Sequence, residues 1–169
     1  MDLVFQGSPE PTIGVEIEVQ LIDPETRDLA PRSPELLNLC EARQLAHVTT
    51  ELHQSMFEVN SGVARTVPEC RQNIEKTFQE LDPLVDHLGL KLAVSGTHPF
   101  QRWTERKFFP GERFLYLEEK FQWLARRMNI YGLHVHVGVR DGDRAMHIAR
   151  SAAKYIPHLI ALSASSPFW

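Results

Sequence analysis

The chain has 169 residues, enough for one domain with a hydrophobic core, and its 43% apolar and 24% charged content is that of a globular protein. A formal net charge of −4 gives no basis for a nucleic-acid or membrane partner, and no run of residues is long and apolar enough to span a bilayer. The two cysteines, Cys40 and Cys70, occupy apolar helix positions, which predicts buried, reduced thiols and a cytoplasmic location.

The first strong pattern is an alternation of apolar and polar side chains over residues 14–21, whose period of two predicts a half-buried β-strand. Its polar face carries Glu16 and Glu18, about 6.6–6.8 Å apart along a strand. Two carboxylates at this spacing repel each other unless a cation or a proton lies between them. An ordinary solvated strand face is the alternative for an isolated pair of this kind.

A helix is predicted next at 33–45, with Ser33 as its N-cap and a proline at its first position. Strand character returns at 57–60. Within that strand Glu58 and Asn60 share one side, and a carboxylate in such an apolar run needs a partner. We therefore expect Glu58 to have a charged or metal partner.

A longer helix is predicted to begin at a capping box formed by Thr66 and Glu69. Pro83 should kink or divide this helix, and Gly89 should end it. A short strand follows at 90–94, where leucine and valine alternate with other residues.

The remaining elements are a loop at 97–111 rich in aromatic and basic residues, a helix at 112–128 with apolar residues at core spacing, and a strand at 131–139. A long helix at 144–164, bent at Pro157, completes the chain. The sequence shows no internal repeat and no linker. It predicts a single α+β domain over residues 1–169, with polar groups on one sheet face and helices on the other.

The strand at 131–139 repeats the pattern of the first strand, because His134 and His136 share one face opposite its apolar side chains. Two imidazoles spaced in this way can bind one cation, although a pair of partly exposed histidines is the alternative. Glu51 lies seven residues before Glu58. Because seven is an odd offset, the two acids can share a site only if the backbone bends between them. Glu51 is otherwise a plain surface acid.

The residue types in these strands favour a particular class of metal. Carboxylates dominate and neither cysteine lies near them, which favours Mg²⁺ or Mn²⁺ over structural zinc. Several acids holding cations suit phosphoryl transfer from ATP, where metal ions neutralise the developing charge. The chain has neither a P-loop nor a G-x-G-x-x-G turn, so nucleotide binding would have to depend on the metal.

Six motifs follow one another along the chain: Gly-Val-Glu-Ile-Glu at 14–18, Thr-Glu-Leu-His at 50–53, Phe-Glu-Val-Asn-Ser-Gly at 57–62, Ser-Gly-Thr-His-Pro-Phe at 95–100, Gly-Leu-His-Val-His-Val-Gly at 132–138 and Ala-Leu-Ser-Ala-Ser-Ser-Pro-Phe-Trp at 161–169. In this order they resemble the bacterial type 2 glutamate–cysteine ligase family, whose members are carboxylate–amine ligases related to glutamine synthetase. The resemblance covers the chain from about residue 12 to its last residue.

The resemblance implies a curved, mainly antiparallel sheet of the glutamine synthetase type. It also implies an ATP-dependent enzyme that phosphorylates the γ-carboxylate of glutamate and lets an amine, such as cysteine, displace the phosphate. Its substrates would be small molecules and its cofactors ATP and Mg²⁺ or Mn²⁺. A homodimer fits the family.

The same resemblance implies roles for individual side chains, although it assigns no catalytic residue. The implied metal ligands are Glu16, Glu18, Glu51, Glu58 and His134. His136 stands where a phosphate or nucleotide contact is expected. The implied substrate-binding residues are Arg102, Arg106 and Asn60. For the two arginines a surface basic cluster is the alternative.

Family members are about twice as long as this chain, which is therefore expected to be the N-terminal portion of a longer catalytic domain. Alone it should bind divalent metal weakly and ligate nothing. Two other functions remain open from the sequence. One is a non-catalytic metal-binding module, because cupin-like barrels also combine strand histidines with a glutamate. The other is a structural or regulatory protein on a ligase scaffold that has lost its chemistry.

Overall fold

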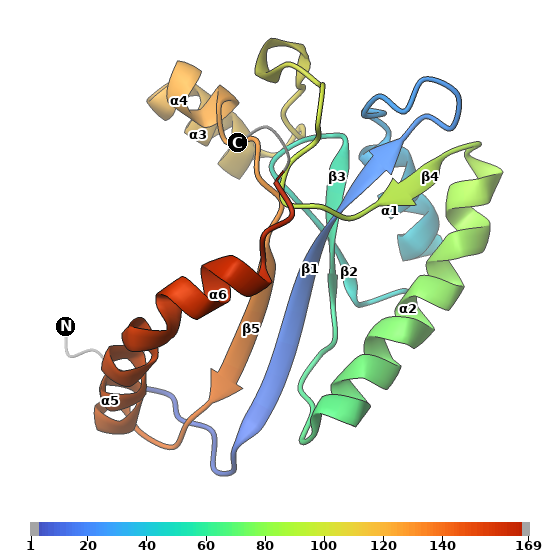
Figure 1. The fold of residues 1–169 in the computed structure, drawn as a ribbon. Coiled ribbons are helices and arrows are strands. Elements are labelled where there is room, and N and C mark those ends of the chain that lie inside the picture. The colour runs from blue at the N-terminus through green and yellow to red at the C-terminus, as the bar shows by residue number, and fades with distance from the viewer. Residues whose placement is uncertain (1–3, 167–169) are drawn as a thin grey trace.

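The computed structural model describes residues 4–166, and its centre is a five-stranded antiparallel sheet (Figure 1). The central strand is β1 (Thr12–Ile22), which confirms the strand predicted there. β3 (Met56–Asn60) pairs along one edge of β1, and β2 (Val48–Thr50) pairs with β3 in turn. The architecture is α+β, as the sequence predicts.

The other edge of β1 carries two strands in succession, β5 (Leu133–Gly138) and β4 (Lys91–Ala93). Ile17 of β1 pairs with β3 and β5 at once, and Gln20 pairs with β3 and β4 at once. Because a strand has only two edges, β4 and β5 must share the edge opposite β3. β5 therefore lies beside the first half of β1, where Glu16 is located.

The hydrophobic core lies between the apolar face of this sheet and two helices, α1 (Ser33–Ala42) and α2 (Val67–His87). Figure 1 shows both helices on the side of the molecule away from β5. The fully buried aliphatic and aromatic side chains of this core are Val19, Leu21, Leu36, Phe57, Val59 and Leu81. Cys40 and Cys70 are buried and unpaired, and burial raises the pKa of the Cys40 thiol to about 11.

The start of α1 differs from the sequence prediction. Ser33 is the first helical residue and not the N-cap, and the residue before it, Arg32, makes no side-chain capping bond. The backbone N–H of Ser33 donates to the carbonyl oxygen of Gln54 at 2.7 Å. A contact between distant segments therefore fixes the start of this helix, and no local sequence pattern records it.

α2 begins and ends largely as predicted. The Thr66 hydroxyl accepts from the Glu69 N–H at 3.2 Å, whereas the Glu69 carboxylate accepts from Arg65, one residue earlier than in a capping box. The helix is not divided at Pro83, because the turn that follows is buried against the core. Gly89, with φ of +69°, ends it in a Schellman motif.

The helix predicted at 112–128 is two helices, α3 (Glu112–Phe121) and α4 (Trp123–Arg126). Gln122 separates them because its φ of +46° is incompatible with a continuous helix. The apolar stripe expected to face a core is largely exposed at Phe121, Leu124 and Met128. The loop before α3 contains a single 3₁₀ turn, Trp103–Glu105.

The last predicted helix is also interrupted. It consists of α5 (Gly142–Ala152), a 3₁₀ turn at Ala153–Tyr155 and α6 (Ile156–Leu162), with Pro157 in the first turn of α6. The end of the sixth motif, Pro167–Trp169, lies outside the described residues. Within residues 4–166 no helix combines the length and apolar character that crossing a membrane requires.

Candidate metal centre

The register of the sheet gathers polar side chains from three strands on one face. Glu16 of β1 pairs directly with Asn60 of β3 and with His134 of β5, while Glu18 pairs with Glu58. Residues directly opposite each other in an antiparallel pair point to the same face. The alternation read from the sequence therefore places all five side chains on the face opposite the core.

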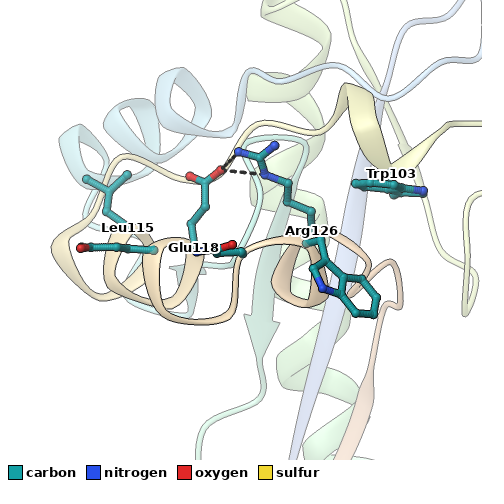
Figure 2. A pocket seen from close by; sticks show the side chains of 7 residues that line it. Trp103, Leu115, Glu118 and Arg126 are labelled. Carbon is teal, nitrogen blue, oxygen red and sulfur yellow. Dashed lines mark hydrogen bonds and ion pairs between the residues drawn. The ribbon is translucent and has the colours of Figure 1, made fainter.

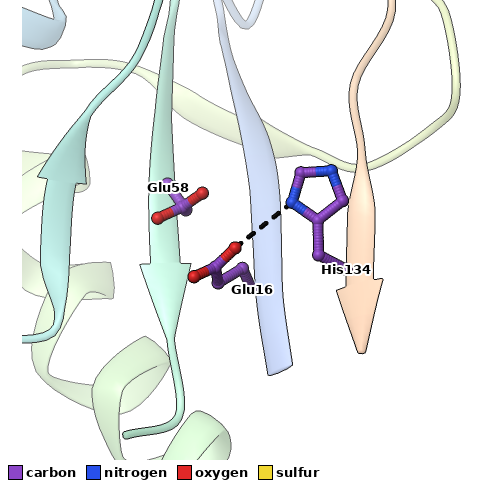
Figure 3. Close-up of side chains that lie close together, drawn as sticks. All are labelled: Glu16, Glu58 and His134. Atoms are coloured by element: carbon purple, nitrogen blue, oxygen red, sulfur yellow. Dashed lines mark hydrogen bonds and ion pairs between the residues drawn. The ribbon is translucent and has the colours of Figure 1, made fainter. Parts of the chain in front are cut away.

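Three of these side chains converge closely enough to bind one metal ion. Glu16, Glu58 and His134 each offer a ligand atom, and the three atoms lie within 4.8 Å of one another (Figure 3). Nδ1 of His134 is 3.2 Å from Oε2 of Glu16. His136, one row further along β5, brings its Nε2 to 2.9 Å from the same oxygen. Glu16, Glu58 and His134 are three of the five residues predicted as metal ligands, and the structure brings them together.

Negative charge is crowded in this group of residues. The hydrogen bond from His136 lowers the pKa of Glu16. Burial raises the pKa of Glu58, and the neighbouring charge of Glu16 raises it further. Carboxylates that repel each other in this way are ready to accept a divalent cation, which removes the repulsion.

Glu51 lies in the turn between β2 and β3, so the backbone bends between Glu51 and Glu58 as the odd offset requires. Burial raises the pKa of Glu51, and its carboxylate accepts from the Leu52 N–H at 2.9 Å. Its charge also raises the pKa of Glu58, which places the two acids in the same neighbourhood. Glu51 is nevertheless not one of the three residues whose ligand atoms converge.

Glu18 is fixed by a glycine that the sequence analysis did not single out. Its Oε2 accepts from the Gly132 N–H at 2.8 Å, and its own N–H donates to the Gly132 carbonyl oxygen at 3.0 Å. A Cβ on Gly132 would lie 2.7 Å from Nε2 of His134 and 3.1 Å from Oε1 of Glu18. Gly132 does not have a positive φ, so a side chain there would conflict with space and not with the backbone, and His134 would have to move. The sequence signal that could have identified Gly132 was its position two residues before His134, at the start of the H-x-H motif.

The predicted substrate-side residues have different environments. Asn60 faces the polar side, but its Oδ1 already lies 3.0 Å from Nδ1 of His47 and accepts from the Gly62 N–H. Arg102 is exposed beside the 3₁₀ turn. Arg106 instead points inward, with its guanidinium carbon 5.2 Å from the centre of the Tyr131 ring.

Arg106 is a largely buried cation among neutral groups. Its Nε and Nη1 are buried without a hydrogen-bond partner in the described part of the chain. His53, completely buried nearby, has its pKa lowered to about 4 because burial disfavours the imidazolium, and burial raises the pKa of Tyr131 to about 12. Sequence analysis assigned no role to His53 or Tyr131, whose side chains both approach Arg106 only in the fold.

A separate surface hollow of about 630 Å³ lies between the 3₁₀ turn and the α3–α4 pair (Figure 2). Trp103, Leu115 and Trp123 line it together with Arg126, whose guanidinium is paired with Glu118 at 2.9 Å. None of the converging acids or histidines borders this hollow. It is therefore distinct from the candidate metal centre.

The donor set fits a hard divalent cation. Two carboxylates and one imidazole converge, two further carboxylates stand nearby, and neither cysteine is among them. Oxygen-rich groups of this kind suit Mg²⁺ or Mn²⁺. The fold and the site thus define an antiparallel α+β protein with a candidate cation centre on its polar sheet face.

Residues 12–169 match the family model described as glutamate-cysteine ligase family 2 (GCS2), and the chain belongs to this family. Curated relatives carry the name "Putative glutamate--cysteine ligase 2". The relative from Gloeobacter violaceus is 43% identical over all of the chain and 46% of its own length. That from Bdellovibrio bacteriovorus is 44% identical over 94% of the chain and 42% of its own length, and that from Thermobifida fusca is 40% identical over 100% and 43%. The chain spans less than half the length of these relatives.

Proposed function

We propose that this chain is the N-terminal, metal-holding part of an ATP-dependent carboxylate–amine ligase. In the proposed reaction the γ-carboxylate of glutamate attacks the terminal phosphorus of ATP, giving γ-glutamyl phosphate and ADP. The nitrogen of an amine such as cysteine then attacks the acyl carbon, phosphate leaves, and the nitrogen loses a proton as the amide forms. Family membership supports the reaction class, and the names of the relatives support glutamate and cysteine.

The observation that carries this proposal is the convergence of Glu16, Glu58 and His134 from three strands within 4.8 Å. Mg²⁺ or Mn²⁺ bound there would supply positive charge for phosphate oxygens. Glu16 and Glu58 would hold the ion, and His134 would complete the protein's contribution. His136, bonded to Glu16 at 2.9 Å, orients that carboxylate and lies where a phosphate contact is expected.

Arg106 supports a carboxylate-bearing substrate. A guanidinium remains charged under all relevant conditions, and a buried charge without a counter-ion is strongly destabilising. Within residues 4–166 no carboxylate forms an ion pair with Arg106. Arg106 stacks on the ring of Tyr131. The next residue, Gly132, is hydrogen-bonded to Glu18 on the polar face, so Arg106 lies near the Glu18 end of that face. We therefore assign Arg106, and not the exposed Arg102, to a substrate carboxylate.

Isothermal titration of the chain with Mn²⁺, with and without a non-hydrolysable ATP analogue, tests the metal-dependent nucleotide site. We expect weak Mn²⁺ binding that the analogue strengthens, and analogue binding that requires Mn²⁺. Glu16→Gln should reduce Mn²⁺ affinity by tenfold or more, because it removes a charged ligand that His136 orients. Glu41→Gln, an exposed acid on α1 at the opposite face, is the matched control and should change nothing.

Analogue binding without metal, or Mn²⁺ affinity that is equal in both variants, would exclude the proposed site. Tight Mn²⁺ binding that is indifferent to the analogue would favour a non-catalytic metal module instead. The same titration with glutamate should show weaker binding in Arg106→Gln than in Arg102→Gln. Equal glutamate binding by the two arginine variants would remove Arg106 from the proposal and leave the metal site standing.

A further inference from the structure

β5 is the most exposed of the strands, because five of its six residues are exposed and none is buried. Leu133, Val135 and Val137 share its apolar side and are 64%, 58% and 61% exposed. Val19 and Val59, on the same apolar side of β1 and β3, are completely buried. The sequence of β5 has the alternation of a half-buried strand, but within residues 4–166 nothing covers its apolar side.

The outer edge of β5 also offers unpaired hydrogen-bonding groups. On β1, the N–H groups of Ile13 and Val15 donate to Ala64 and to the Ser61 hydroxyl, on the side away from β5. Their partners Val137 and Val135 therefore belong to the non-hydrogen-bonded pairs of this ladder. The N–H groups of Leu133, Val135 and Val137 consequently point away from β1, toward an edge that pairs with no described strand.

The two helices after β5 are bare in the same way. Neither α5 nor α6 contains a buried residue. Their apolar side chains are nevertheless concentrated, with Met146, Ile148, Ile156, Leu159 and Ile160 all between 44% and 65% exposed. Figure 1 shows α5 and α6 on the β5 side of the molecule, away from α1 and α2. Exposed apolar side chains gathered on successive elements in this way mark an interface.

The relatives indicate what covers this surface. The chain matches 42–46% of their lengths, so each has more than half of its residues beyond the matched part. The cation centre, on the opposite face of the sheet, is also open at its β5 end, because His134 and His136 are more than half exposed and three ligand atoms converge within the described residues. Mg²⁺ requires about six ligands. One further segment beside β5 could cover the apolar face and supply oxygen ligands.

We propose that β5, α5 and α6 form the docking surface for the remaining part of a full-length family member, and that this part adds a strand to the free edge of β5. Side chains alternate along a strand, so this strand carries apolar residues toward Val135 and polar residues toward His134. Helices following it pack on α5 and α6. The docking depends only on family membership, whereas the polar contribution to the cation centre rests on the proposed function.

The test produces this chain in the same cells as the remaining portion of the Gloeobacter violaceus relative, as two separate polypeptides, and purifies the pair that they form. Residue-level amide exchange is followed by NMR for the chain alone and for the purified pair. In the chain alone the amides of Leu133, Val135 and Val137 should exchange rapidly, while those of His134 and His136, bonded to β1, should be protected. In the pair the first three should slow at least tenfold.

A matched pair of variants locates the interface. Val135→Lys places a charge on the apolar side of β5 and should abolish co-purification without unfolding the chain, because the side chain is already exposed. Val63→Lys, at a valine 78% exposed in the turn after β3, should leave the pair intact. Failure of the wild-type chain to form the pair, or a pair in which the three amides still exchange rapidly, overturns the proposal. A dimer of the chain alone that protects these amides overturns it in favour of a second copy.

Unchanged Mn²⁺ affinity in a pair that does protect the three amides would retain the docking surface and reject only its contribution to the cation centre. The two proposals therefore fail separately.

Discussion

Two halves of this molecule have similar sequence patterns and opposite environments. The packed half comprises β1 to β4 with α1 and α2, and the bare half comprises β5, α5 and α6. Val19 in the first and Val135 in the second both belong to strictly alternating strands, yet the first is completely buried and the second is 58% exposed. The alternation defines which face a side chain occupies, whereas burial depends on what else packs there.

The largest difference between the halves should be in their response to pH. His53, in the packed half, is the only histidine among residues 4–166 with no exposed surface, and those of the bare half are exposed. Its pKa is about 4 in the folded chain, against 6.5 for a histidine exposed to water. The unfolded chain therefore takes up a proton between pH 6.5 and 4 that the folded chain refuses. The contribution of neutral His53 to the free energy of unfolding is therefore fully present above pH 6.5. It falls by up to about 3 kcal/mol as the pH is lowered toward 4.

Urea unfolding at several pH values measures this loss in the wild type and in His53→Gln, which should lack it. Glu51 and Glu58, whose pKa values are raised, act in the opposite direction, so the difference between the two proteins is the informative quantity. His87→Gln, at an exposed position, should retain the wild-type dependence. Parallel pH profiles for wild type and His53→Gln would contradict this assignment.

Truncating one valine in each half compares their packing directly. Val59→Ala, in β3, should lower the free energy of unfolding by about 2 kcal/mol, because it removes fully buried methyl groups and leaves a cavity. Val135→Ala, in β5, should cost less than about 0.5 kcal/mol. Chemical denaturation of the 169-residue chain measures both. Similar losses would show that β5 is packed in solution and would weaken the comparison.

The sequence predicted the packed half well because local pattern and tertiary contact agree there. The face of Glu16 and Glu18, the Thr66 cap and the Gly89 end of α2 all followed from spacing and backbone chemistry. The predicted N-cap of α1 was wrong. The hydrogen bond from the Ser33 N–H to the Gln54 carbonyl oxygen joins two distant segments, and no local sequence pattern shows that they approach each other.

The predictions for the chain after β4 were less successful for a different physical reason. An apolar stripe at 112–128 predicted one core helix, yet Gln122 breaks it and Phe121 and Leu124 are exposed. A stripe shows that a helix is able to pack, but it does not place the packing partner within the same 169 residues. At the site, the H-x-H spacing located His134. The space kept clear by Gly132 became visible only once β5 and Glu18 were side by side.

Gly132 joins the two halves at the cation centre and should be sensitive to the smallest substitution. Gly132→Ala keeps an ordinary backbone conformation but places a methyl group 2.7 Å from Nε2 of His134, so the imidazole must move. We expect Mn²⁺ affinity to fall at least tenfold, equivalent to about 1.4 kcal/mol, with little change in stability. Titration calorimetry measures the Mn²⁺ affinity, and the NMR signals of the His134 ring report the movement of the imidazole.

The control for this change is Gly142→Ala, at the first residue of α5, where an added methyl group meets only ordinary contacts at 3.6 Å. It should leave Mn²⁺ affinity unchanged. Unaltered affinity in Gly132→Ala would show that His134 does not contribute to binding the ion in the orientation described.

Two helix caps provide the smallest test of the comparison. Thr66 caps α2 in the packed half and Asp141 caps α5 in the bare half, and each side chain accepts from the N–H three residues later. Thr66→Ala should lower the free energy of global unfolding by about 1 kcal/mol, because α2 is part of the core. Asp141→Ala should leave global unfolding within about 0.3 kcal/mol of wild type, since α5 buries no side chain. Its effect should instead be faster amide exchange within α5.

If docking of the remaining part packs α5, the same Asp141→Ala change should lower the stability of the purified pair. Thr66→Ala should cost the same in the isolated chain and in the pair. A cost for Asp141→Ala in the isolated chain equal to that of Thr66→Ala would mean that the two halves unfold as one cooperative unit.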